Sequence, residues 1–161
     1  MKPLIVLLTS FVISLLTLYF IRGQYEPALS GRIAMSVMLV FTALAHFVYT
    51  KGMTMMIPDF VPVKKQVVYL SGIIEMIAAI GLLIPVFRHG TALLLILFFI
   101  ILLPANIFAA IKHIDYQKGS SDGAGVNYLW FRIPLQILFI LWTYFSTINI
   151  SPWIMGYSGA K

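Results

Sequence analysis

Residues 91–111 read TALLLILFFIILLPANIFAAI, and this stretch decides the class of fold. It contains no charged residue and is about as long as the roughly 20 residues that a helix needs to cross a bilayer core of about 30 Å. A transmembrane strand would instead alternate apolar and polar residues over about 10 positions. The stretch therefore predicts a membrane-spanning α-helix.

Four further apolar runs have the same character. They cover residues 3–21, 33–50, 67–86 and 128–148. The first is long for the apolar part of a signal peptide and lacks a small-residue cleavage site after it, so we expect it to be a retained helix. We predict an all-α polytopic membrane protein with one domain over residues 1–161: a four-helix transmembrane bundle at about 32–148, plus an additional N-terminal transmembrane helix at about 3–21.

Composition excludes several other classes of protein. Of the 161 residues, 61% are hydrophobic and 10% are charged, whereas soluble domains average about half apolar and a quarter charged. A soluble globular enzyme and a disordered chain are both excluded. The absence of cysteine excludes disulfides, thiolate nucleophiles and cysteine-ligated metals. The formal charge of +6 comes from residues scattered through short gaps, without the basic stripe typical of nucleic-acid binding, and predicts contact with lipid headgroups instead.

The basic residues also predict an orientation. With five spans, the N-terminus and the second and fourth connections share one side of the membrane. That side carries Lys2, Lys51, Lys64, Lys65, Lys112 and Lys118, and the other carries Arg22, Arg32, Arg88 and Lys161. Cytoplasmic loops are enriched in Lys and Arg. We therefore expect an integral protein of the bacterial inner membrane, with its N-terminus inside and its C-terminus outside.

Five polar residues lie inside the apolar runs, where ionisable groups are costly and indicate function by default. They are His46, Glu75, Asn106, Arg132 and Gln136. Each shares a helix face, at spacings of three and four, with small or polar neighbours, so each face is predicted to point inward. Because successive helices run in opposite directions, His46, Glu75, Asn106 and Arg132 belong to one half of the membrane. We expect one buried cluster, with Glu75 paired to Arg132 and the other three around them.

Two interpretations of this cluster stay open. It can be a polar clasp that fixes helix packing, or a site that binds a ligand or handles protons. His46 is more typical of a hydrogen-bonded core histidine than of a metal ligand, and no ligand spacing supports a metal site. No catalytic motif is present, so we assign no catalytic residue and expect a protein that is not an enzyme by itself.

Six short motifs occur in order between about residues 32 and 147. They are AHF at 45–47, IPDFVP at 57–62, SGIIE at 71–75, GLLIP at 81–85, PANI at 104–107 and RIPLQ at 132–136. Together they resemble the DoxX-like family of small integral membrane proteins. The resemblance implies a four-helix membrane bundle, from which this chain departs by its first helix. It also implies a role beside a quinone-linked oxidoreductase, in a redox-stress membrane complex, or as an assembly chaperone for receptor channels.

We hold three functional hypotheses. The first is a quinone-linked accessory component of a membrane redox system, in which the polar cluster binds a quinone and a partner protein supplies electrons. The second is a non-catalytic chaperone or assembly factor, which the Met-rich connection at 51–66 would suit. The third is a small-molecule or proton transporter, ranked last because no inverted repeat is visible. The lipid bilayer is a partner in all three.

Overall fold

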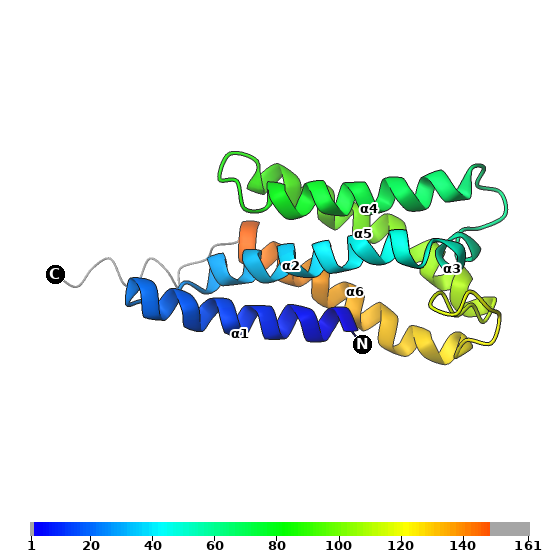
Figure 1. The fold of residues 1–161 in the computed structure, drawn as a ribbon, viewed down its shortest axis with the longest axis horizontal. Helices are drawn as coiled ribbons and strands as arrows, with labels where there is room; N and C mark the ends of the chain where they lie inside the picture. The colour runs from blue at the N-terminus through cyan, green and yellow to red at the C-terminus, as the bar shows by residue number, and fades with distance from the viewer. Residues whose placement is uncertain (1, 149–161) are drawn as a thin grey trace.

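The apolar runs of the sequence form the long helices of the computed structural model, which describes residues 2–148 (Figure 1). The long helices are α1 (Lys2–Arg22), α2 (Pro27–Val48), α4 (Lys64–Gly81), α5 (Arg88–Ile111) and α6 (Leu129–Thr143). Three short elements complete the fold: α3 (Thr50–Met55), a 3₁₀ turn η1 (Gly125–Tyr128) and a π-helical turn η2 (Tyr144–Ile148). The all-α prediction is confirmed for the described residues.

Within residues 2–148, four helical segments are long and apolar enough to cross a membrane. They are α1, α2, α5 and the continuous stretch Gly125–Ile148. Four such segments are consistent with an integral membrane protein. The helix α4 is not among them, because Lys64, Lys65 and Glu75 interrupt its 18 residues.

The end of α4 differs from the prediction. The apolar run was expected to continue to residue 86, but the helix ends at Gly81 and turns lead into α5. Pro85 explains part of this difference, since proline disfavours helical backbone in the residue before it. At this point α4 comes close to α5, because a Cβ on Gly81 would overlap the Thr91 hydroxyl.

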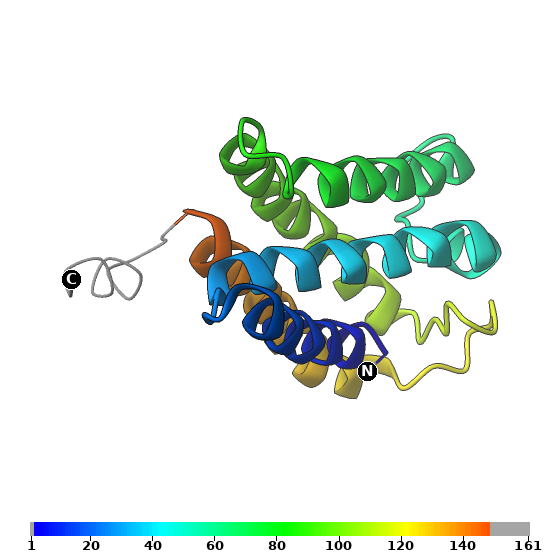
Figure 2. The ribbon, with the colours of Figure 1, turned by 60° about the vertical axis from the view of Figure 1, so that its left-hand side comes forward.

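The helix α2 occupies the middle of the bundle (Figures 1 and 2). It packs against α1 on one side and α4 on the other, while α5 packs against α6. The turn η2 brings the end of the described chain back against α2 and α5. The core comprises Leu7, Ala34, Met35, Met38, Leu39, Ala78, Ala79, Leu82, Ala92, Leu95, Phe99, Leu135 and Phe139.

The outer faces of the helices are apolar as well. In α1 only Leu7 and Ser14 are buried, and Ile13 and Phe20 are 65% and 82% exposed. Leu94 on α5 is 69% exposed. Side chains of this kind on the outside of a long helix suggest contact with lipid rather than with water.

The connection between α2 and α4 holds a helix that the sequence analysis did not predict. The short helix α3 ends at Met55, shortly before Pro58. In the chain that follows it, Ile57 is buried and Phe60 is 85% exposed. The helix α3 packs closely on the connection between α5 and α6, as shown by Gly52, where a Cβ would overlap the Tyr116 carbonyl oxygen. The second and fourth connections therefore share one end of the bundle, as predicted.

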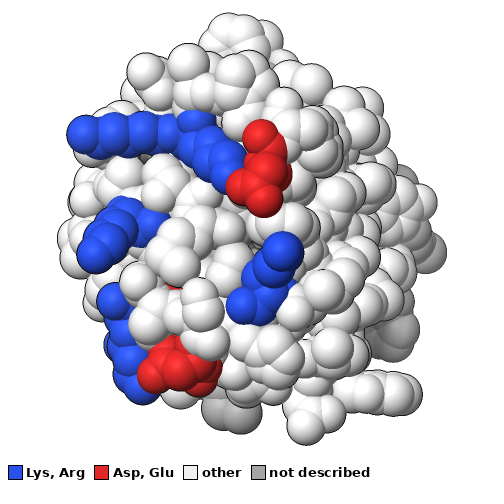
Figure 3. Space-filling view, turned by 90° about the vertical axis from the view of Figure 1, so that its right-hand side faces the viewer, with Lys and Arg blue, Asp and Glu red and all other residues white. Residues whose placement is uncertain are grey.

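That end carries a cluster of Lys and Arg side chains with acidic neighbours (Figure 3). Lys64 donates to Asp59 at 2.7 Å, and this hydrogen bond holds the pKa of Asp59 below its usual value. The backbone amides of Gln117 and Lys118 both donate to Asp115 Oδ1, which fixes the turn after α5.

Candidate functional site

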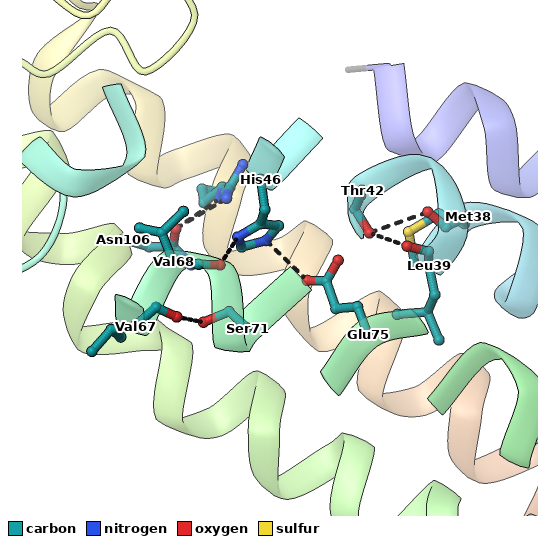
Figure 4. A network of polar contacts seen from close by, with 10 residues as sticks. Met38, Leu39, Thr42, His46, Val67, Val68, Ser71, Glu75 and Asn106 are labelled. Atoms are coloured by element: carbon teal, nitrogen blue, oxygen red, sulfur yellow. Dashed lines mark hydrogen bonds and ion pairs between the residues drawn. The ribbon is translucent and has the colours of Figure 1, made fainter. Parts of the chain in front are cut away.

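The first polar contact inside the bundle joins α2 to α4 (Figure 4). His46 Nε2 lies 3.4 Å from Glu75 Oε1, and His46 Nδ1 lies 3.1 Å from the Val68 carbonyl oxygen. The Glu75 residue is only 4% exposed, and its other oxygen, Oε2, is buried and has no hydrogen-bond partner among the described residues.

The contacts of His46 indicate which of its nitrogens carries a proton. A carbonyl oxygen only accepts hydrogen bonds, so Nδ1 of His46 donates to Val68. Nε2 then faces Glu75 Oε1 at ion-pair distance. An imidazolium beside a carboxylate and a neutral imidazole beside a carboxylic acid are both net neutral arrangements of such a pair.

Small residues bring the two helices together at this contact. A Cβ on Gly72 would lie 3.0 Å from His46 Cβ and 3.2 Å from the Ala43 carbonyl oxygen. Small residues let helix backbones approach closely in membrane proteins. Gly72 therefore lies beneath His46 and allows its ring to reach Glu75, one turn further along α4.

A second network joins α5 to α6. Arg132 donates from Nε and Nη2 to Asn106 Oδ1 at 3.2 and 3.0 Å, and from Nη1 to the Tyr128 hydroxyl at 3.1 Å. Asn106 Nδ2 donates to Gln136 Oε1 at 3.0 Å. Gln136 in turn donates to the Phe99 carbonyl oxygen. The buried amide groups of Asn106 and Gln136 thus all have protein partners.

Two prolines lie beside this network, at positions where they loosen the helices that carry it. Pro104 in α5 and Pro134 in α6 each lack the amide hydrogen that an interior helical residue donates. Because Pro104 has no amide hydrogen, the carbonyl group of residue 100 loses its helical hydrogen bond. The neighbouring carbonyl group, that of Phe99, is the one that accepts a hydrogen bond from Gln136. Side-chain hydrogen bonds between the helices therefore reinforce a region where the backbone ladders are interrupted.

Three of the five candidate side chains are buried, but the predicted pairing of Glu75 with Arg132 is wrong. Glu75, Asn106 and Gln136 are buried, and the His46 side chain is 14% exposed. Among residues 2–148, however, Glu75 contacts His46, and no carboxylate forms an ion pair with Arg132. The five candidate residues form two groups, because α4 packs on α2 and α6 packs on α5.

Three partners in these groups were missed by the sequence analysis. Tyr128 lies four residues before Arg132 and so shares its helix face, a spacing that could have indicated the contact. The carbonyl groups of Val68 and Phe99 carry no such signal, because every residue has a carbonyl. No group of three His, Asp or Glu side chains that could hold a metal ion occurs in the described part of the chain.

A comparison with protein families matches residues 35–147 to a family described as a domain of unknown function, DUF8561. The match covers more than half of the chain. The chain belongs to this family. All five candidate residues lie inside the matched range, and α1 lies before it. Comparisons with curated proteins and with solved structures find no match.

Proposed function

We propose that this protein binds a lipid-soluble small molecule at the His46–Glu75 pair, and that a quinone of a membrane redox system is the first candidate. One observation carries the proposal: the buried, unpartnered Glu75 Oε2, on a carboxyl group whose other oxygen lies 3.4 Å from His46 Nε2. A buried polar atom without a hydrogen bond is costly, at about 1–3 kcal/mol. A ligand group that supplies the missing bond removes that cost.

The chemistry of a quinone fits this pair. Its two carbonyl oxygens accept hydrogen bonds, and its reduction to a quinol takes up two electrons and two protons. Glu75 in its protonated form donates a hydrogen bond to a bound carbonyl oxygen and supplies one of the two protons. A partner protein supplies both electrons, and the second proton comes from water. His46 and Glu75 are therefore binding and proton-donating residues in this proposal.

The resemblance to the DoxX-like family supports the choice of quinone and stays a prediction. The assembly-factor and transporter hypotheses also stay predictions, because no described contact favours either. The methionine-rich connection suggested the assembly-factor hypothesis, and its Met53 and Met55 side chains are half-buried in α3. The Lys-rich end with α3 is proposed to face the cytoplasm of a bacterial inner membrane.

The test uses the full chain, purified in mild detergent. Native mass spectrometry and organic extraction identify what is bound, and titration with a ubiquinone measures saturable binding. The expected result is a quinone on the parent that Glu75→Gln loses. Glu26→Gln is the matched control, because Glu26 pairs with Arg22 in an exposed contact of 2.7 Å at the opposite end.

Two results contradict the proposal. One is a parent that neither retains nor saturably binds the quinone. The other is a Glu75→Gln variant that binds it as the parent does. Unfolding of each variant in the same detergent shows whether a loss of binding accompanies a loss of fold.

A further inference from the structure

We propose that Arg32 and Arg88 bind the phosphate group of an anionic phospholipid, with one acyl chain in the groove between α2 and α4. This site lies at the end of the bundle opposite the Lys-rich connections. It is separate from the His46–Glu75 pair and does not depend on the function proposed above.

The two arginines lie near one end of the groove between α2 and α4. Arg32 lies one helical turn before Ser36 and Arg88 lies four residues after Ile84, and both Ser36 and Ile84 line that groove. Arg32 Nη1 donates to the Ser146 carbonyl oxygen at 3.2 Å, which holds its guanidinium at the end of the bundle. Among the described residues, neither arginine forms an ion pair, and Nε of Arg88 is buried without a hydrogen-bond partner.

The surrounding chain offers little negative charge. Glu26, just before α2, is engaged by Arg22 at 2.7 Å. An external anion is therefore the natural counter-charge, and guanidinium groups bind phosphate oxygens through charge-assisted hydrogen bonds.

An apolar groove lies between α2 and α4 and begins one helical turn from Arg32. It has a volume of about 420 Å³ and is lined by Ser36, Val37, Val40, Ala79, Ile80, Leu83 and Ile84. Ser36 lies one helical turn after Arg32, and Ile84 lies in the turn that leads to Arg88. The volume falls in the range of about 300–1,000 Å³ typical of small-molecule sites.

One polar group lines this groove and lacks a partner. Ser36 is 5% exposed, and its hydroxyl has no hydrogen-bond partner among residues 2–148. The ester carbonyl of a phospholipid lies between the phosphate and the acyl chain, as Ser36 lies between the arginines and the apolar part of the groove. The order of charged, hydroxyl and apolar groups thus matches a phospholipid from headgroup to tail.

The test titrates the full chain in detergent with phosphatidylglycerol and with phosphatidylcholine, and counts bound lipids by native mass spectrometry. The parent is expected to prefer phosphatidylglycerol. Arg88→Gln should weaken that binding by about tenfold or more, as loss of a charge-assisted hydrogen bond implies. Lys118→Gln is the matched control, because Lys118 lies at the opposite end beside Asp115 and Asp122, and it should bind as the parent does.

A second pair of variants tests the groove. Val37→Trp places a large ring in the groove and should reduce lipid binding, whereas Val12→Trp on the exposed face of α1 should not. Equal affinity of the parent for both lipids, an unchanged Arg88→Gln, or unchanged binding in Val37→Trp overturns the proposal. Full displacement of the lipid by millimolar inorganic phosphate also overturns it, because the site would then be an anion site alone.

Discussion

The contacts between α5 and α6 differ from those between α2 and α4 in how completely their polar atoms are paired. Asn106 and Gln136 use their amide groups on Arg132, on each other and on the Phe99 carbonyl. Glu75, at similar burial, uses one oxygen on His46 and leaves the other without a partner. A fully paired network contributes to packing, whereas an incompletely paired group keeps the capacity to bind something else.

The largest effect is expected where the pairing is complete. Asn106→Leu removes the acceptor of two Arg132 hydrogen bonds and the donor to Gln136, so it should lower the free energy of unfolding by roughly 2–4 kcal/mol. Chemical unfolding in mixed micelles measures this change. Asn127→Leu, at an exposed position in η1, is the control and should change little. A loss no larger than that of the control would show that the network does not stabilise the bundle.

An intermediate effect is expected at the close approach of α2 and α4. Gly72→Leu places a side chain against His46 and the Ala43 carbonyl, and overpacking of this kind costs about 1–3 kcal/mol. It should also move His46 away from Glu75 and abolish binding at that pair. Gly90→Leu is the matched control, because a Cβ there meets nothing within 4 Å. If both variants unfold alike, the helices do not depend on Gly72 for their approach.

The smallest effect on stability is expected at Glu75 itself. Glu75→Leu removes a buried carboxyl group with one unpaired oxygen, and the His46 that remains keeps its hydrogen bond to the Val68 carbonyl and can be neutral, so no unpaired charge is left. We expect an unfolding free energy within about 1 kcal/mol of the parent, together with complete loss of quinone binding. A destabilisation as large as that of Asn106→Leu would make the α2–α4 contact a structural clasp and remove the difference between the two regions.

The sequence predicted the helices well where hydrophobicity was continuous. Residues 91–111 were expected to be helical, and α5 begins only a few residues earlier and ends at Ile111. The prediction was less accurate around Gly81 and in the connection that contains α3. There Gly81 and Gly52 lie against Thr91 and Tyr116 of other segments, contacts that the order of residues along one helix does not show.

The candidate residues were found for a local reason. Polar side chains in an apolar helix must avoid lipid, so spacing along each helix was enough to indicate that Glu75, Asn106 and Gln136 face inward. Their partners were not predictable in the same way. Charge alone favoured Glu75 with Arg132, and the structure instead places His46 against Glu75 and Asn106 against Arg132.

The sequence by itself determined that this is a chain of long apolar helices, and which face of each carries polar groups, because both follow from residue order along one helix. Only the tertiary structure decided that α4 packs on α2 and α6 on α5, and so which polar groups meet. It also decided which atoms stay unpaired, namely Glu75 Oε2, the Ser36 hydroxyl and Arg88 Nε. Pairing depends on distances of a few ångströms between helices, and such distances are set by the packing of many side chains together.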